Sequence, residues 1–153
     1  MAYEFTRKTD NVDDVMAVDV NELQAAIEAI GVSKFVCNGR LTLQSGVPVS
    51  ISDQADKVTL YFTPYNGNEI SLYDGTNWIR HEFTERSLAL GALTASRPHD
   101  IFIYDNAGTL TLSATAWTNA TTRATALTTQ DGVYVKTGAT GYRYLGTIYI
   151  DSG

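Results

Sequence analysis

Two histidines and a close pair of glutamates are the residues of this chain best suited to acid–base chemistry. His81 and His99 are not in the HxH or HExxH spacing that directs two imidazoles to one metal ion. Glu82 and Glu85 have the chemistry of a glycosidase pair, but nothing around them indicates a sugar-binding cleft. They stand beside two arginines, as in a solvated charged cluster. The sequence contains no recognisable catalytic set, and we expect a protein that is not an enzyme.

Motifs for metals, nucleotides and cofactors are also missing from the sequence. Asp10, Asp13 and Asp14 lack the alternate spacing and central glycine of a calcium loop. Neither a GxxxxGK[ST] phosphate loop nor a Gly-x-Ser-x-Gly elbow occurs. Cys37, the single cysteine, excludes an intrachain disulfide. Its apolar surroundings favour a small buried side chain over an intersubunit or reactive thiol. We expect no metal and no cofactor.

Aromatic side chains offer a different chemistry, which is stacking on sugar rings or anchoring a protein interface. The chain has nine tyrosines and two tryptophans. The candidates for surface recognition are Tyr65, in a Pro-Tyr-Asn-Gly turn, Trp78 and Trp117. Alternating strands also use such residues as half-buried cross-strand partners, so core packing is the alternative for each.

Charge and hydropathy exclude several partners. The net charge is −6 and the eleven basic residues are scattered, which argues against nucleic acid and favours solubility or a basic partner surface. No apolar run approaches the roughly 20 residues of a membrane span. The N-terminus has no apolar segment of the signal-peptide type. We therefore expect synthesis in the cytosol and no membrane partner.

The elements that must position these side chains are mostly strands. From residue 34 onward, short β-branched and aromatic runs alternate with turn residues, including Asn-Gly at 66–67 and Asp-Gly at 131–132. Asn-Gly at 38–39 is expected to be another turn, and residues 47–51 another strand. The pattern predicts an antiparallel β-sandwich, jelly-roll-like or Greek-key, over residues 34–153.

Residues 1–33 differ from the rest and are expected to be an arm followed by one short helix. The helix spans about residues 20–30 and carries an apolar stripe, and it is too short to be stable without packing against something. The stripe either covers an opening of the β domain or meets its counterparts in other subunits. The candidate residues for attachment and oligomerisation are Val18, Leu23, Ile27 and Ile30.

Four motifs in the β-rich part carry a resemblance to a known group of proteins. They are YFTPY at 61–65, LYDG at 72–75, YDNAG at 104–108 and QDGVYVK at 130–136. With the stretches around them, about residues 40–148, they resemble a β-rich domain of tailed-bacteriophage virion structural proteins. Such proteins include tail-fibre, head-fibre and capsid-decoration proteins, and residues 17–31 are similar to the short helices that precede their β domains.

The resemblance implies a non-enzymatic homotrimer on the virion, made in the host bacterial cytoplasm. Its partners would be other virion proteins, such as the major capsid protein. The chain has no long repetitive or collagen-like shaft, which favours a capsid decoration (cement) or head-fibre protein. The alternative is a tail-fibre or receptor-binding adhesin, a carbohydrate-binding β-module that holds a host surface glycan through its exposed aromatic residues.

Overall fold

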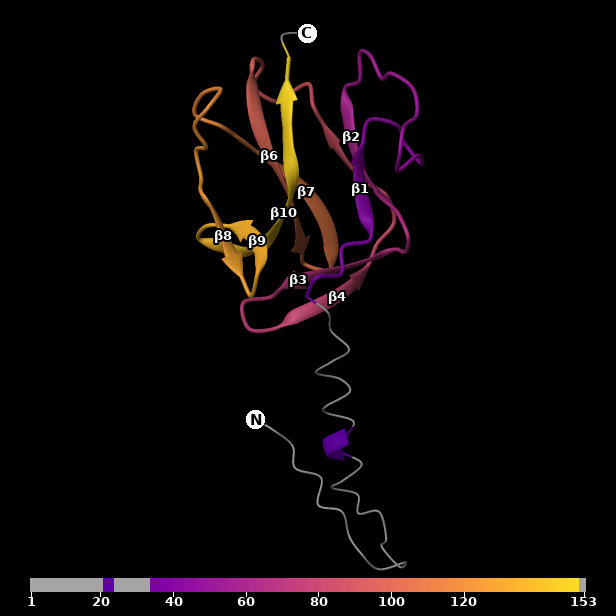
Figure 1. The fold of residues 1–153 in the computed structure, drawn as a ribbon, viewed down its shortest axis with the longest axis vertical. Helices are drawn as coiled ribbons and strands as arrows, with labels where there is room; N and C mark the ends of the chain where they lie inside the picture. The colour runs from indigo at the N-terminus through magenta and orange to yellow at the C-terminus, as the bar shows by residue number, and fades with distance from the viewer. Residues whose placement is uncertain (1–20, 24–33, 152–153) are drawn as a thin grey trace, which may run out of the picture. The chain divides into compact units, whose positions relative to one another are not determined.

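The computed structural model describes residues 21–23 and 34–151. Residues 34–151 form ten strands, all paired antiparallel, in three sheets (Figure 1). The mainly β, antiparallel fold expected from the sequence is confirmed. The strands are β1 (Gly39–Thr42), β2 (Thr59–Pro64), β3 (Glu69–Tyr73), β4 (Trp78–Glu82), β5 (Arg86–Ala89), β6 (Arg97–Asn106), β7 (Thr109–Ala116), β8 (Leu127–Gln130), β9 (Val133–Lys136) and β10 (Ala139–Ile150).

The three sheets differ in size. The largest has five strands in the order β7-β6-β10-β9-β8, the second has the order β1-β2-β5, and β3 pairs only with β4. In Figure 1 the β3–β4 hairpin lies across one end of the two larger sheets. Strand β10 pairs with β9 at its start and with β6 further on, and its register shifts between Tyr144 and Gly146. This bulge lies where β10 leaves β9.

Apolar side chains from all three sheets meet in one core. Phe62 of β2 stacks on Phe83, with ring centroids 4.9 Å apart. Because the three-stranded and five-stranded sheets bury side chains in the same cluster, they act as the two layers of a sandwich. The buried members of the cluster are Leu60, Phe62, Ile70, Leu72, Phe83, Ile101, Ile103, Leu110 and Leu112.

Strand β6 is buried on both of its faces. Ile101 and Ile103 point into the core, whereas Asp100 and Phe102 point to the outer face, and all four are buried. The outer face is covered by β9 and by residues 117–126, which connect β7 to β8, as the contacts described below establish. Its position between two covers explains why β6 has a continuous rather than an alternating burial pattern.

The expected hairpin turn at Asp131 and Gly132 joins the paired strands β8 and β9, with φ of 51° and 86°. Asn66 and Gly67 also have positive φ, 57° and 129°, but the expected hairpin there is wrong, because they link β2 and β3, which lie in different sheets. Positive φ at these positions is what Asn-Gly and Asp-Gly dipeptides supply at low steric cost.

Two further local expectations are wrong. Gly39 does not form a turn but begins β1, and a Cβ on it would lie 2.3 Å from the Phe62 ring, so the glycine is needed for close approach. Residues 47–51 are a loop rather than a strand, and Ile51 is 99% exposed. A short β-branched run forms a strand only where a neighbouring strand and a buried face are available.

The chain divides into two units, Met1–Gly31 and Val32–Gly153. Of the expected helix at 20–30, residues 21–23 are described; they are helical and exposed, with Leu23 48% exposed. Val18, Ile27 and Ile30 lie outside the described residues. Within the part of the chain that is described, no helix has the length and apolar character needed to cross a membrane.

Candidate functional site

The residues with acid–base potential come from different elements: His99 from β6, His81 and Glu82 from β4, and Glu85 from the connection between β4 and β5. His99 is buried, with its Nδ1 3.2 Å from the Arg97 carbonyl oxygen, and His81 lies apart from it on β4. Glu82 is exposed at the end of β4. Among the described residues, no three His, Cys, Asp or Glu side chains gather in a way that would hold a metal ion.

Glu85 holds a loop in place rather than forming a solvated cluster. Its carboxylate accepts hydrogen bonds from the hydroxyls of Ser45 and Thr63 and from the backbone N–H of Gly46, at 2.7 Å for the last. Partial burial raises the pKa of Glu85, but these three hydrogen bonds outweigh it and leave the pKa below its ordinary value. The contacts tie the loop after β1 to β2.

Two of the three candidate recognition residues pack within the β domain. Tyr65 is half-buried, and the Arg40 guanidinium lies 4.3 Å from its ring centroid. Trp78 is half-buried too, and its indole N–H donates to Asp131 at 2.9 Å. These contacts give both side chains a packing role, and the structure does not bring either of them together with Trp117.

Trp117 lines a cavity on the outer side of the five-stranded sheet. The volume of the cavity is about 660 Å³, and it is widely open to solvent. Its walls come from the β7–β8 connection and from β8, β9 and β10. The lining residues are Trp117, Thr121, Thr122, Arg123, Ala126, Leu127, Tyr134 and Tyr144. We call this space the outer cavity.

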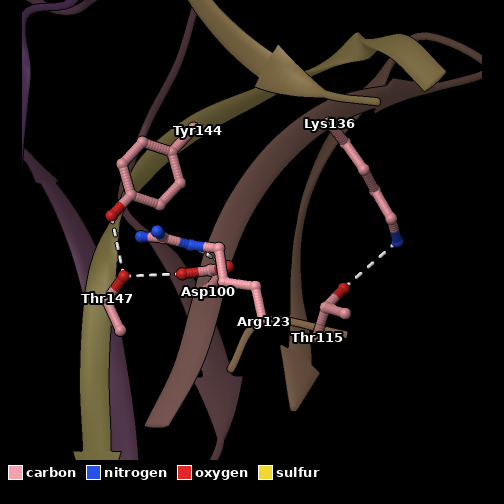
Figure 2. Close-up of polar contacts among 6 residues, drawn as sticks. All are labelled: Asp100, Thr115, Arg123, Lys136, Tyr144 and Thr147. Atoms are coloured by element: carbon pink, nitrogen blue, oxygen red, sulfur yellow. Dashed lines mark hydrogen bonds and ion pairs between the residues drawn. The ribbon is translucent and has the colours of Figure 1, made fainter. Parts of the chain in front are cut away.

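A buried carboxylate, Asp100, organises the polar contacts around Arg123 and Tyr144, two residues that line the outer cavity (Figure 2). Asp100 is 2% exposed, and its two oxygens accept hydrogen bonds from Arg123 Nε at 2.9 Å and from Thr147 Oγ1 at 2.6 Å. Thr147 Oγ1 is in turn 2.7 Å from the Tyr144 hydroxyl. Because a buried charge is stable only when it is paired and hydrogen-bonded, Asp100 fixes the positions of the groups that reach it.

Arg123 connects this network to the wall of the cavity. Its guanidinium carbon lies 4.6 Å from the ring centroid of Trp117, which is a cation–π contact. The side chain of Arg123 is 37% exposed, whereas that of its partner Asp100 is 2% exposed. The guanidinium therefore has one end held by the buried carboxylate and remains partly open to solvent.

The rest of the outer face is aromatic. Phe102 and Tyr144 meet edge to face at 5.9 Å, and Tyr104 stacks on Tyr142 at 4.2 Å. Lys136 of β9 extends over this surface, 5.6 Å from the Phe102 centroid, and donates to Thr115 at 3.1 Å (Figure 2). The aliphatic stem of a lysine can cover rings in this way while its ammonium group finds a polar partner.

A second organising cation, Arg143, lies on the inner side of β10. It is 7% exposed, and its Nη1 donates to the carbonyl oxygens of Lys34, Val36 and Ser71 at 2.8–3.0 Å. Its Nη2 reaches the carbonyl oxygen of Phe35 at 3.4 Å. One buried guanidinium thus ties β10 to β3 and to residues 34–36, where the β domain begins.

Cys37 lies close to this arginine. Burial raises the pKa of the Cys37 thiol, and the positive charge of Arg143 only partly offsets that effect. Burial likewise lowers the pKa of Arg143, with Cys37 acting in the opposite direction. The thiol is half-buried and packs against the core cluster, in agreement with a small apolar side chain.

Sequence reasoning identified Trp117 but missed Asp100, Arg123 and Arg143. Two of these carried a signal in the sequence. Asp100 precedes the apolar run IFIY, and Arg143 stands between two tyrosines in a strand-like run. A charged residue inside such a run is either exposed or buried with partners, and the choice depends on whether the strand is covered on one face or on both.

A search of protein-family models, of curated proteins and of solved structures found no match to this chain.

Proposed function

We propose that this protein is a bacteriophage virion structural protein, most simply a capsid decoration (cement) or head-fibre protein. Residues 1–33 would attach the chain to the virion or join it to its copies, and the β domain would be displayed outward. The protein would bind and stabilise the virion surface by burying apolar area and by adding strands at subunit junctions, without catalysis.

The observation that best supports this proposal is the way in which Arg143 holds the start of the β domain. A displayed domain transmits any load on it to its point of attachment through the first residues of its fold. Here that stretch is bonded through the carbonyl oxygens of Lys34, Phe35 and Val36 to a buried cation, and the Ser71 N–H donates to the Val36 carbonyl at 3.0 Å. Such a connection suits a structural protein that must stay attached to the virion surface under load.

Exposed apolar side chains offer surface for association. Phe35 is 63% exposed next to this connection, and Leu23 is 48% exposed in the N-terminal unit. Phe35 lines a cavity of about 520 Å³ between β1 and β10, two strands that approach closely where Gly146 faces Leu41. Along β1, the described hydrogen-bonded neighbour is β2 alone. An edge strand beside apolar side chains is a suitable place for another subunit.

The association step can be tested with the double substitution Leu23→Asp and Ile27→Asp. We expect a trimer for the native protein by light scattering and a monomer for the variant, because a charge on the stripe opposes its burial. Near-ultraviolet circular dichroism should show that the β domain stays folded. A variant with Ser52→Asp and Ala55→Asp, two exposed loop positions, adds the same charge and should remain a trimer.

The virion assignment has its own test. Antibodies raised against the β domain should label intact particles in electron microscopy, when the particles come from the phage genome that encodes this chain. Labelling of the capsid would agree with a decoration or head-fibre protein, and labelling of the tail would favour the tail-fibre alternative. Unlabelled particles from which mass spectrometry also fails to detect the chain would reject a virion role.

A further inference from the structure

We propose that the outer cavity is a binding site for a neutral saccharide. This inference does not depend on the virion assignment, because it rests on the walls, the polar groups and the charge of the cavity itself. It goes beyond the proposed structural role, because it assigns a ligand-binding function to the β domain.

The walls of the outer cavity suit the apolar face of a pyranose ring. Trp117, Tyr134 and Tyr144 are rigid aromatic side chains from three different elements, and Ala126 and Leu127 add apolar surface. The C–H groups on one face of a sugar ring pack on such surfaces, and aromatic groups supply large contact area at low conformational cost. Tyr134 is 58% exposed, so much of its ring is available to a ligand.

The polar groups of the cavity match the hydroxyl groups of a sugar. Each hydroxyl both donates and accepts a hydrogen bond, so a sugar site needs groups of both kinds. Arg123 contributes donors and Thr122 a hydroxyl, whereas the Thr121 hydroxyl donates to Asn119 Oδ1 at 3.0 Å and contributes an acceptor. Polar groups that converge beside apolar surface are the usual composition of a specific small-molecule site.

The charge of the site favours a neutral ligand over an anion. Arg123 is the only formally charged residue among those that line the outer cavity, and its charge is compensated by Asp100 directly behind it, at 2.9 Å. The whole chain carries a net charge of −6, which opposes the approach of an anion. A neutral hydroxyl-rich ligand uses the Arg123 donors without needing an unbalanced positive charge.

The connection that forms one wall is held in its binding conformation before any ligand arrives. Asn119 Oδ1 accepts hydrogen bonds from the backbone N–H groups of Thr121 and Thr122, at 2.9 and 2.8 Å. Arg97 donates to the carbonyl oxygen of Trp117 at 3.2 Å. The backbone N–H of Thr137, the residue after β9, donates to the carbonyl oxygen of Ala126 at 3.1 Å. A wall fixed at both ends and at its turn loses little freedom on binding.

The test is a titration of the full-length protein with the methyl α-pyranosides of glucose, galactose and mannose. Binding is followed by intrinsic tryptophan fluorescence and by amide chemical shifts in two-dimensional NMR. We expect saturable binding of at least one glycoside, with shifts concentrated at residues 117–126 and at β9. An immobilised-glycan array, probed with the same protein, extends the search to larger neutral saccharides.

Two tyrosines provide a matched pair of variants. Tyr134 and Tyr149 are both 58% exposed, but only Tyr134 lines the outer cavity. Tyr134→Ala should weaken binding about tenfold, the effect of losing one good aromatic contact. Tyr149→Ala should leave the affinity unchanged. Because both side chains are largely exposed, neither change should unfold the domain, and circular dichroism checks this.

Three results would overturn the proposal. One is the absence of binding to every neutral glycoside in solution and to every neutral glycan on the array. Another is equal loss of binding in the two tyrosine variants, which would place the ligand elsewhere. The third is tighter binding of methyl glucuronide or inorganic phosphate than of any neutral glycoside, since it would identify an anion site built on Arg123.

Discussion

The two faces of β6, which lies between β7 and β10 in its sheet, are both buried, but by different means. On the inner face, Ile101 and Ile103 of β6 join a wholly apolar cluster. On the outer face, Asp100 and Phe102 of the same strand lie beneath Arg123 and Lys136, whose cationic groups contact them. The inner contacts depend on shape and apolar area, and the outer contacts depend on charge and hydrogen bonds.

We therefore expect the inner face to contribute mainly to stability and the outer face mainly to recognition. Apolar packing gains free energy from every buried methylene group, and it is indifferent to direction. A buried carboxylate with two donors is directional, so it places its partners at defined positions but adds less net stability. We expect substitutions on the inner face to unfold the domain, and substitutions on the outer face to disturb the cavity first.

The largest effect should come from the inner face. Ile101→Ala removes buried methyl groups from a side chain with no exposed surface, and it should lower the free energy of unfolding by about 3–4 kcal/mol. Urea denaturation followed by tryptophan fluorescence measures this. Ile79→Ala, the same change at a position 41% exposed, should cost less than about 1 kcal/mol. Similar losses at both sites would contradict the assigned position of the core.

The second prediction tests whether a buried polar side chain on the inner side contributes as much to the free energy of unfolding as an apolar one. Arg143→Met takes a donor away from the carbonyl oxygens of Phe35, Val36 and Ser71, of which Val36 still accepts from the Ser71 N–H, and we expect a loss of about 2–3 kcal/mol. Hydrogen exchange should rise selectively in residues 34–38. Arg80→Met removes an exposed ion pair with Glu69 and should cost less than about 1 kcal/mol.

The outer face should be less sensitive. Asp100→Asn keeps the shape of the side chain but removes the charge that holds Arg123 Nε, so we expect a loss of about 1–2 kcal/mol in urea denaturation. The same variant should lose saccharide affinity, because Arg123 is no longer held beside Trp117. Asp105→Asn provides the control: this exposed residue of β6 accepts a hydrogen bond from the Gly108 N–H, and an amide oxygen can replace it. A larger loss for Asp100→Asn than for Ile101→Ala would reverse the comparison.

The smallest effect on stability should come from Glu85, which lies on neither face, and it should appear only at acidic pH. The pKa of Glu85 is lowered in the folded protein, so its contribution to stability is present above the pKa of an unfolded glutamate, about 4.3. That contribution is lost as the pH falls through the lowered folded pKa. Glu85→Gln should flatten the acid limb of a stability–pH curve, measured by urea midpoints. Glu82→Gln, at an exposed position of β4, should leave the curve unchanged.

Local patterns predicted the strands where turn chemistry and alternation agreed. The hairpin β8–β9 follows from Asp131 and Gly132 between two short strand-like runs, and the structure has it at the expected place. Asn66 and Gly67 were expected to close a hairpin as well, but they link β2 and β3, which lie in different sheets. The same logic failed at residues 47–51, which have strand-forming residues but form a loop. Strand propensity describes how well a residue fits a sheet, but it does not reveal whether a neighbouring strand is available for pairing.

The candidate site was predictable only in part. Trp117 was a candidate because its ring can stack on a sugar or anchor an interface, but its neighbours Tyr134 and Tyr144 come from strands that follow it in the sequence. Tyr65 was expected to be exposed because it lies in a turn, and it is half-buried under Arg40. Exposure of a turn residue depends on what other segments lie beside the turn, which alternation within one strand does not reveal.

The sequence by itself determined that this protein is mainly β, that its strands are antiparallel and that hairpins turn at its Asp-Gly dipeptides. These features follow from interactions between residues close along the chain, where backbone sterics and side-chain alternation decide the outcome. The tertiary structure alone decided that Asp100 and Arg143 are buried with partners and that three aromatic side chains share one cavity. Those outcomes arise from contacts between segments far apart in the sequence, such as Arg143 with Lys34, and therefore depend on how the sheets are stacked.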